Sequence, residues 1–557
     1  MVEDGRRQVL LHGLVFASTF DSGNLQTVVY DAGASEYVVT AAPDPARTPS
    51  PTTWFYFSIS NLAPHQSIAL RVRNLVRHVA LYDQDMRPVT RALPSQRKWE
   101  RLHTSVGMTP SDPDFSITFR LTAPMPGDVV YVAFTYPYAY ADLQRSLRRL
   151  DADMAARDDL YYCRETLVTS LDGHNVDLLT LSSRRHLVDA CEPTVPELFP
   201  EHDAPRSRLF QTKRVVVLTA RVHPAETPSS YVVDGVLAFL VKRDDPRVVA
   251  LLDAFVFKII PMLNPDGVVR GYYRHDTLGQ NLNRYYDAPT LEAQPTIYGV
   301  RHWFLALCDA EAPSVYVDLH AHAAKRGCFI YGNRLESIDA QVATQLFPKL
   351  VGLNSAHFEY DQCTFTAENM VMVEKRDGGL SKQGCARVAL HNATKAAHPS
   401  LHFYTLECNY NSGRKPGRVP PTGTWAPRGV KASGPLSPEV AARSYLPKYT
   451  PAAWADVGKG LMLGLLDLYG LNPCSRLPQS SWRTLAGVVQ ETRRQVAPTF
   501  IKTPASASAS SAIEKRKSSL RSSNQDETLS TQVRAIKAAP GTVRLQKPLL
   551  RRQSTSK

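Results

Sequence analysis

The sequence predicts an α/β protein with a β-rich N-terminal region, and three features of its pattern support this. Residues 1 to about 145 contain short β-branched and aromatic runs separated by Pro, Gly, Asn and Asp, as in a β-sandwich. Beyond them, apolar strand-like runs alternate with helical stretches, which predicts a largely parallel or mixed sheet with helices on both faces. After about residue 498, Ser, Ala, Lys and Arg dominate, which predicts disorder. The expected domains are an antiparallel β-sandwich (1–145), an α/β domain with a mixed central sheet (146–475), and a linker with a disordered basic tail (476–557).

The N-terminal strands are expected where aromatic and β-branched residues gather. These runs are Leu10 to Phe20, Thr53 to Ser60, Ile68 to Val72, Phe115 to Leu121 and Val129 to Phe134. From Tyr140 to Met154 leucines recur at spacings of three and four, which predicts a helix and a domain boundary near 145. The N-terminal region carries no catalytic constellation, so its expected role is packing or partner binding.

The second region alternates between strand-like and helical patterns. The expected strands are Val215 to Ala220, Ala254 to Leu263 and Ser314 to Leu319, and the expected helices are Ser230 to Lys242, Ile297 to Asp309 and Ala453 to Tyr469. Ligands of such sheets bind outside the carboxyl ends of the strands. Polar residues directly after these strands are therefore the first candidates for a functional site.

Composition and charge exclude several classes of protein. The chain of 557 residues is 43% hydrophobic and 21% charged, which is ordinary for a globular protein. It has no apolar run of 18 residues, and we expect neither a signal peptide nor a membrane span. The eight cysteines are scattered, so free thiols in a reducing compartment are expected. Of the net charge of +13, residues 501–557 supply +9, which weakens a nucleic-acid interpretation of the basicity.

A His-x-x-Glu pair follows the first strand expected in the second region. His223 and Glu226 would offer an imidazole and a carboxylate at the rim of the sheet, although such a pair alone is usually structural. His320 ends another strand-like run and is the expected third ligand, with His322 as the alternative. Two histidines and one glutamate leave a fourth position for water, as in a hydrolytic zinc site. Asp318 is a candidate hydrogen-bond acceptor behind the ligands, or a surface or capping acid.

Two further segments carry charged residues that suit catalysis. Arg274, Asn283 and Arg284 lie in a loop after a Pro-Asp-Gly turn, and guanidinium groups bind carboxylates and oxyanions; an exposed basic loop is the plain alternative. Glu407 lies in an apolar, aromatic strand, where an acid is costly to bury without a partner or a role. It would serve as a general base facing a zinc-bound water, or as one half of a salt bridge to a core arginine.

Together these segments resemble the funnelin-type zinc metallocarboxypeptidases and, within them, the cytosolic carboxypeptidases. The motifs that carry the resemblance lie at 16–25, 136–144, 221–230, 257–271, 281–284, 318–333, 353–358 and 404–414. The similarity covers roughly residues 10 to 475. In place of His-Gly-His-Ser this chain has His320-Ala321-His322-Ala323, and Cys385-Ala386 replaces small Ser and Gly residues.

The resemblance implies a role for each candidate residue. One zinc ion per catalytic domain would be bound by His223, Glu226 and His320, with Glu407 as the base. Arg274 would polarise the scissile carbonyl, and Asn283 and Arg284 would bind the terminal α-carboxylate. Arg387 would meet an acidic side chain of the substrate, with Lys382 as its rival.

The resemblance also implies a substrate and a location. The expected activity is removal of glutamate from polyglutamylated proteins, chiefly tubulin tails, including the γ-linked branch-point glutamate, in the cytoplasm. The alternatives are shortening of other acidic C-terminal tails, a zinc amidohydrolase of small N-acyl amino acids, and an inactive microtubule-binding protein. No membrane or specific nucleic-acid partner is expected. The basic tail would steer the enzyme to acidic tails, or its Lys515-Arg516-Lys517 cluster would serve nuclear import, or it would have no role.

Overall fold

The computed structural model describes residues 7–45, 52–109, 115–123, 125–201, 204–311, 313–374, 377–415, 417–422 and 448–501. The tail that was expected to be disordered, and most of the Pro- and Gly-rich stretch 414–450, lie outside these residues. Among the helices that are described, none combines the length and the apolar composition needed to span a bilayer.

The N-terminal domain consists of two sheets that enclose a shared apolar core, and it confirms the predicted sandwich. The first sheet has the order β1 (Gln8–Leu11), β2 (Leu14–Ala17), β5 (Tyr56–Ser60), β11 (Val129–Ala133), β7 (Val89–Leu93) and β8 (Gln96–Arg101). The second has the order β3 (Thr27–Asp31), β4 (Glu36–Thr40), β6 (Ser67–Arg73), β10 (Ser116–Thr122) and β9 (Gly107–Thr109). The short helix α1 covers Val79–Tyr82.

Two features of the sandwich differ from the prediction. The run Leu10 to Phe20 is not one strand, because it turns at His12 and Gly13, where φ is 51° and 80°. Positive φ at both positions suits a tight hairpin, so β1 and β2 pair antiparallel. The paired strands described in this domain run antiparallel, with the exception of β4 and β6, which run parallel.

The α/β domain is built on a mixed sheet, as predicted, and this sheet has seven strands among the described residues. Their order is β12 (Leu160–Thr169), β13 (Asn175–Ser183), β17 (Phe255–Ile260), β16 (Arg214–Ala220), β18 (Pro313–His322), β20 (His402–Asn409) and β19 (Cys328–Gly332). The four strands from β17 to β20 are parallel, and the outer strands pair antiparallel. A separate hairpin pairs β14 (Leu187–Cys191) with β15 (Arg208–Phe210).

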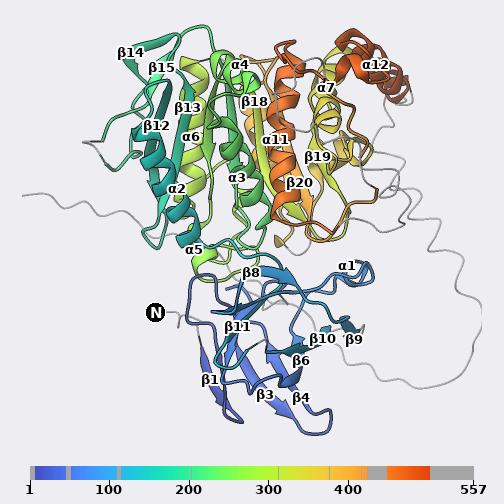
Figure 1. Cartoon of the computed structure of the whole chain (residues 1–557). Helices are drawn as coiled ribbons and strands as arrows, with labels where there is room; N and C mark the ends of the chain where they lie inside the picture. Colours follow the sequence, from blue (N-terminus) through green and yellow to red (C-terminus); the bar gives the residue numbers. More distant parts are fainter. Residues whose placement is uncertain are drawn as a thin grey trace, which may run out of the picture. The chain divides into compact units, whose positions relative to one another are not determined.

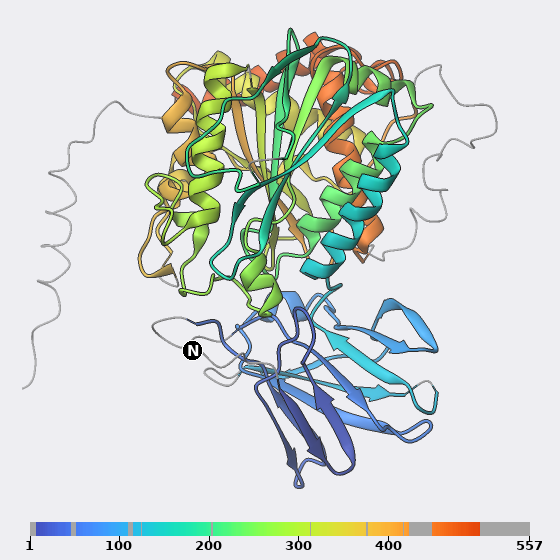
Figure 2. The ribbon, with the colours of Figure 1, turned by 90° about the vertical axis from the view of Figure 1, so that its left-hand side faces the viewer.

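Helices cover both faces of this sheet, which Figure 2 shows nearly edge-on. Side chains alternate along β16, so that Val216 and Leu218 join the cluster of one face while Val215 and Val217 join that of the other. On the first face lie α3 (Pro228–Leu240), α4 (Pro246–Ala254), α7 (Ile338–Asn354) and α11 (Pro451–Leu468), and Figure 1 shows these in front of the sheet. On the second lie α6 (Pro295–Ala310) and α9 (Ala386–Thr394). The remaining helices are α2 (Tyr140–Ala155), α5 (Pro265–Val269), α8 (Ala367–Val371), α12 (Leu485–Ile501), η1 (Leu282–Arg284), η2 (Tyr360–Gln362), η4 (Lys382–Gly384) and η5 (Leu477–Gln479).

Helix α12 lies in the stretch that was expected to be a linker. Val488 and Val496 are buried, and the Lys349 ammonium of α7 donates to Thr492 Oγ1 at 3.2 Å. Val488, Thr492 and Val496 follow one another at intervals of four residues, so they lie on one face of the helix. The stretch 485–501 is therefore a packed part of the structure and not an unstructured linker.

The β-sandwich holds the segment of the α/β domain that carries Arg274. The Asp44 carboxylate accepts hydrogen bonds from the backbone N–H groups of Tyr273, Arg274 and His275 at 2.6, 2.8 and 3.0 Å. Asn24 Nδ2 donates to the Gly271 carbonyl at 2.8 Å. The N-terminal domain thus positions part of the site described next, although it contributes few side chains to it.

Candidate active site

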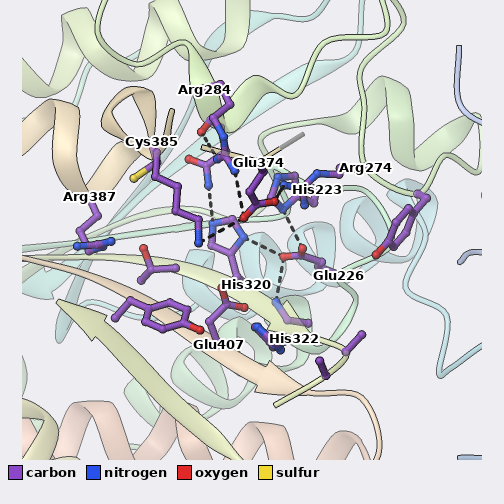
Figure 3. Close-up of a pocket in the computed structure, with 18 of the residues that line it drawn as sticks. His223, Glu226, Arg274, Arg284, His320, His322, Glu374, Cys385, Arg387 and Glu407 are labelled. Carbon is purple, nitrogen blue, oxygen red and sulfur yellow. Dashed lines mark hydrogen bonds and ion pairs between the residues drawn. The ribbon is translucent and has the colours of Figure 1, made fainter. Parts of the chain in front are cut away.

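The three predicted metal ligands lie together at the carboxyl ends of β16 and β18. Because these strands are parallel neighbours, the turn after Ala220 brings His223 beside His320. Pro228 begins α3 and places Glu226 just before it. His223 Nδ1 and His320 Nδ1 lie 2.8 and 2.9 Å from the two oxygens of Glu226. All three are buried, and a ligand atom from each lies within 4.8 Å of the others (Figure 3).

A second layer of polar groups holds the outer nitrogen of each histidine. His320 Nε2 lies 2.7 Å from Asp318 Oδ2, and the other oxygen of Asp318 accepts from Thr219 Oγ1 at 2.8 Å. His223 Nε2 lies 3.0 Å from Asn281 Oδ1. Asp318 is therefore an acceptor behind the ligand and not a capping or surface acid. Contacts of this kind orient a ligating imidazole, so both Nδ1 atoms face the same point.

The donor set fits zinc. Two imidazole nitrogens and one carboxylate are the ligands of hydrolytic zinc sites, with a further position for water. Burial lowers the pKa of His223 to about 4, which favours the neutral form that a metal ligand needs. His322, the alternative ligand, does not belong to the group, because its Nδ1 accepts from the Lys325 N–H at 2.9 Å. Of the two candidates for the third ligand, His320 and not His322 lies with His223 and Glu226.

Glu407 lies next to the metal ligands on β20, where its register partner is His320. Burial raises the pKa of Glu407 to about 8, although His320 opposes this rise. Among the described residues no ion pair includes Glu407, and its Oε2 is buried without a hydrogen-bond partner. The salt bridge that was the alternative is therefore absent there, and the carboxyl faces the pocket with one oxygen available to a water molecule.

A cavity of about 250 Å³ opens beside the three metal ligands and Glu407. Its lining combines cations, aromatic rings and small residues, shown in part in Figure 3. The main lining residues are His78, Tyr273, Arg274, Asn283, Arg284, His322, Tyr331, Asn369, Glu374, Lys382, Cys385, Arg387 and Tyr410. All the predicted site residues therefore border one cavity, together with His78 from the β-sandwich.

Arg274 and Arg284 share a buried carboxylate. Arg274 Nε and Nη2 donate to the two oxygens of Asp377 at 2.9 and 3.0 Å, and Arg284 Nη2 lies 2.7 Å from the same carboxylate. Burial disfavours the charge of Arg274, but Asp377 outweighs it, and the pKa of Arg274 is raised. Asp377 thus fixes both guanidinium groups in place, although burial lowers the pKa of Arg284. They are not the exposed basic loop of the alternative interpretation.

Asn283 and Arg387 are brought together by a close backbone approach. Gly384 lies so near the Arg284 backbone that an added Cβ would sit 2.1 Å from its carbonyl oxygen. In the same contact, the Ala386 N–H donates to Asn283 Oδ1 at 3.2 Å. Arg387 then follows at the start of α9, with its side chain 2% exposed.

Arg387 has only neutral oxygen partners in the described part of the chain. It donates to the Gly332 carbonyl at 2.8 Å, to Asn333 Oδ1 at 2.6 Å and to Asn369 Oδ1 at 2.8 Å. No ion pair there joins Arg387 to a carboxylate. Burial lowers the pKa of Arg387. A buried guanidinium without a counter-ion at the wall of a cavity favours an acidic ligand.

Several residues of this site were not among the candidates from the sequence. Asn281, Glu374, Asp377 and Asp44 act through contacts between segments far apart in the chain, with 103 residues separating Arg274 from Asp377. Asn281 could have been suspected, because it stands beside the Asn283-Arg284 pair that the motif contains. The other three have no motif or periodicity that marks them.

Comparisons with known proteins agree with this geometry. Residues 154–299 match the family model described as zinc carboxypeptidase, and residues 16–135 match that of the cytosolic carboxypeptidase N-terminal domain. The chain is 34% identical to cytosolic carboxypeptidase-like protein 5 of Danio rerio, over 86% of this chain and 67% of that protein. This chain belongs to the cytosolic carboxypeptidases. It is also 30% identical to human cytosolic carboxypeptidase 6, over 83% of this chain and 79% of that one.

Two solved structures of metallo-carboxypeptidases share the fold. A metallo-carboxypeptidase from Burkholderia cenocepacia superposes with a TM-score of 0.57 at 20% identity, covering 82% of this chain and 99% of that one. One from Pseudomonas aeruginosa, solved with (2-guanidinoethylmercapto)succinic acid, gives a TM-score of 0.58 at 17% identity over 82% and 99%. The β-sandwich contains the first of the two regions that match family models, 16–135, and the α/β domain contains most of the second, 154–299. It spans about two thirds of the length of its protein 5 relatives.

Proposed function

We propose that this cytosolic carboxypeptidase removes glutamate from polyglutamylated proteins, including a glutamate joined through the γ-carboxyl of a branch point. The observation that supports this is Arg387, which is buried at the wall of the cavity with no carboxylate partner among the described residues. An acidic side chain of the substrate would supply that partner. A leaving glutamate has two free carboxylates whether it was α-linked or γ-linked, so one pair of sites accepts both.

The chain's own residues orient the substrate for hydrolysis. Asn283 and Arg284 would bind the α-carboxylate, while Arg387 would bind the side-chain carboxylate. Arg274, held by Asp377, would direct its positive charge at the scissile carbonyl oxygen, where negative charge develops. These contacts place the peptide or isopeptide carbon beside Glu407.

Glu407 would move the proton of the reaction. His223, Glu226 and His320 would hold zinc, which lowers the pKa of a bound water and polarises the carbonyl. Glu407 would take a proton from the water as the water oxygen bonds to the carbonyl carbon of the substrate. It would then give that proton to the leaving amine as the C–N bond breaks.

The proposed partners are glutamylated tubulin C-terminal tails and other proteins with acidic tails, encountered in the cytoplasm. The family to which the chain belongs is named for the cytosol, and a cationic pocket suits a chain of glutamates. An inactive microtubule-binding protein is one of the other candidates from the sequence. The buried and unpaired Glu407 Oε2 favours the enzyme, because a group that had lost its role would not need to stay buried and unpaired.

The test is mass spectrometry of two tubulin-tail peptides, one with a single γ-linked branch glutamate and one with a linear glutamate chain. The zinc-loaded wild type should remove glutamate from both, and Glu407→Gln should remove none at the same zinc content. Cleavage of the linear peptide alone would retain the carboxypeptidase and refute branch-point removal. Cleavage of neither, with zinc bound, would refute the proposed activity.

A further inference from the structure

The segment 271–276, which carries Arg274, has neither a helix nor a strand to fix its backbone. The N–H groups of three consecutive residues, Tyr273, Arg274 and His275, instead converge on the Asp44 carboxylate at 2.6, 2.8 and 3.0 Å. Successive N–H groups that point at one place form a concave site for an anion. Here the anion is a side chain of the β-sandwich. The position of the Arg274 backbone therefore depends on a contact between the two domains.

Asp44 has the contacts of a group that must keep this place. Its side chain is 4% exposed, and His275 Nδ1 lies 3.0 Å from its Oδ2, so four groups of the α/β domain contact one carboxylate. In the described part of the chain, no lysine or arginine forms an ion pair with Asp44. Hydrogen bonds to an ionised acceptor are roughly twice as strong as neutral ones. Loss of the charge on Asp44 would weaken all of these contacts together.

A second residue of the sandwich ties the stretch that carries Asp44 to the same segment. Asn24 Oδ1 accepts from the Ala42 N–H at 2.8 Å, and Asn24 Nδ2 donates to the carbonyls of Ala42 and Gly271 at 3.0 and 2.8 Å. Gly271 lies so close to the sandwich that an added Cβ would sit 2.3 Å from the Gly23 carbonyl oxygen. Asn24 thus holds Asp44 and Gly271 in one fixed relation.

Arg274 is consequently fixed at both ends. Asp44 holds its backbone N–H, and Asp377 receives two parallel hydrogen bonds from its guanidinium at 2.9 and 3.0 Å. Figure 3 shows Arg274 beside the candidate metal ligand His223, across the pocket from Arg387. A shift of the backbone would move the guanidinium relative to the place where negative charge develops on the substrate. A displacement of about 1 Å can cost about 100-fold in rate.

We propose that Asp44 is a positioning residue of the reaction, through which the β-sandwich holds Arg274 toward the scissile carbonyl. The inference rests on the proposed function, because it takes the charge of Arg274 to act on that carbonyl. Asp44 does not line the cavity, so its effect on the reaction passes through Arg274. The sandwich would then contribute to turnover, beyond the packing or partner binding expected from the sequence.

The experiment compares Asp44→Asn with wild type on the linear and the branched glutamate peptides, with zinc content and folded fraction measured in each sample. The variant keeps the size of the side chain but presents an NH2 group to N–H groups that need an acceptor. Its kcat should fall about 10- to 100-fold and its KM should change less than about threefold, because Arg274 acts on the transition state. Asn24→Ala leaves the carboxylate in place and removes its ties to Ala42 and Gly271, so kcat should fall in the same way but less.

Asp128→Asn is the matched control. Asp128 is another buried carboxylate of the sandwich, and it accepts the backbone N–H groups of Ser95 and Met125, each at 3.1 Å, within its own domain. Its variant should lower the melting temperature and leave kcat of the folded protein unchanged. Hydrogen exchange of the amides of residues 273–275 gives a readout apart from activity. It should become faster in Asp44→Asn and stay as in wild type in Asp128→Asn.

A double-mutant cycle with Arg274→Ala decides whether Asp44 acts through Arg274. In the Arg274→Ala background, Asp44→Asn should change kcat less than about twofold, because the group that it positions is gone. An equal fall of kcat in both backgrounds would show a general structural role and overturn the proposal, as would an unchanged kcat in Asp44→Asn alone. If the wild type cleaved neither peptide, the proposed function and this inference would both be wrong. Cleavage by the wild type together with either of the two overturning outcomes would refute this inference alone.

Discussion

Arg274 and Arg387 stand on different sides of one cavity, and the chain treats their charges in opposite ways. Arg274 is paired with the buried Asp377, whereas Arg387 meets only carbonyl and amide oxygens among the described residues. The pKa of Arg274 is raised because Asp377 outweighs its burial, and that of Arg387 is lowered by burial. A preformed pair suits a group that must keep one position. A cation without an internal partner suits a group that binds an acidic ligand.

Substitution of Glu407 should cause the largest fall in activity, because the two arginines only orient the substrate on which Glu407 acts. Glu407→Gln keeps the size of the side chain but cannot accept the proton of water. We expect kcat to fall about 1,000-fold, as for loss of a general base. Steady-state kinetics with zinc quantified by mass spectrometry would check this. Activity near that of wild type at full zinc occupancy would mean that another group is the base.

Asp377→Asn should destabilise the fold, because it removes the counter-ion of two buried arginines. We expect the free energy of unfolding at pH 7, measured with denaturant, to fall by about 3 kcal/mol. Asp361→Asn, which removes the partner of the exposed Arg414, is the matched control and should cost less than about 0.5 kcal/mol. An equally small loss in Asp377→Asn would show that the pair with Arg274 contributes nothing.

The loss of stability caused by Asp377→Asn should also depend on pH. Burial opposes ionisation of Asp377, but Arg274 and Arg284 outweigh it and hold its pKa below the ordinary value. For an acid of depressed pKa, the stabilisation is complete above the unfolded pKa of about 3.9 and is lost as pH falls through the folded pKa. The difference between wild type and Asp377→Asn should therefore be constant above pH 5 and shrink below pH 4.

Arg387→Met should act on specificity and not on stability. Removing a buried charge that lacks a counter-ion should leave the unfolding free energy unchanged or raised. The ratio of kcat/KM for peptides ending in glutamate over those ending in leucine should fall about 50-fold. Arg334→Met, outside the cavity, is the control. A loss of stability like that of Asp377→Asn would contradict the contrast between the two arginines.

Asp234 offers the reverse case, a half-buried acid without a cation among the described residues. Burial raises its pKa to about 6, although a hydrogen bond from Tyr138 at 2.8 Å opposes this. Because the folded pKa exceeds the unfolded one, stability falls as pH rises from about 4 to about 6. Asp234→Asn should be more stable than wild type by about 1 kcal/mol above pH 6, and the gain should vanish toward pH 4. Melting curves over a range of pH would show whether the gain in stability of Asp234→Asn disappears toward pH 4. Asp244→Asn, at an exposed position, is the control.

The fold was predictable wherever a local pattern repeats. The alternation along β16 and the leucine spacing of α2 follow from the geometry of strands and helices, so both were placed to within a few residues. The hairpin at His12 and Gly13 was missed, because an apolar run does not show where its chain reverses. Helix α12 was missed because its short apolar face is set in a polar stretch.

The sequence by itself placed His223, Glu226 and His320 near the carboxyl ends of parallel strands, which meet at one edge of the sheet, but it left His322 open as the alternative to His320. The partners of the arginines were decided only by the tertiary structure. Arg274 lies 103 residues from Asp377 and is held through its backbone by Asp44 of the other domain, 230 residues away. Spacing in a sequence predicts neighbours within an element or along a sheet edge. Which carboxylate meets a guanidinium across two loops depends on how those loops pack, and no local pattern records it.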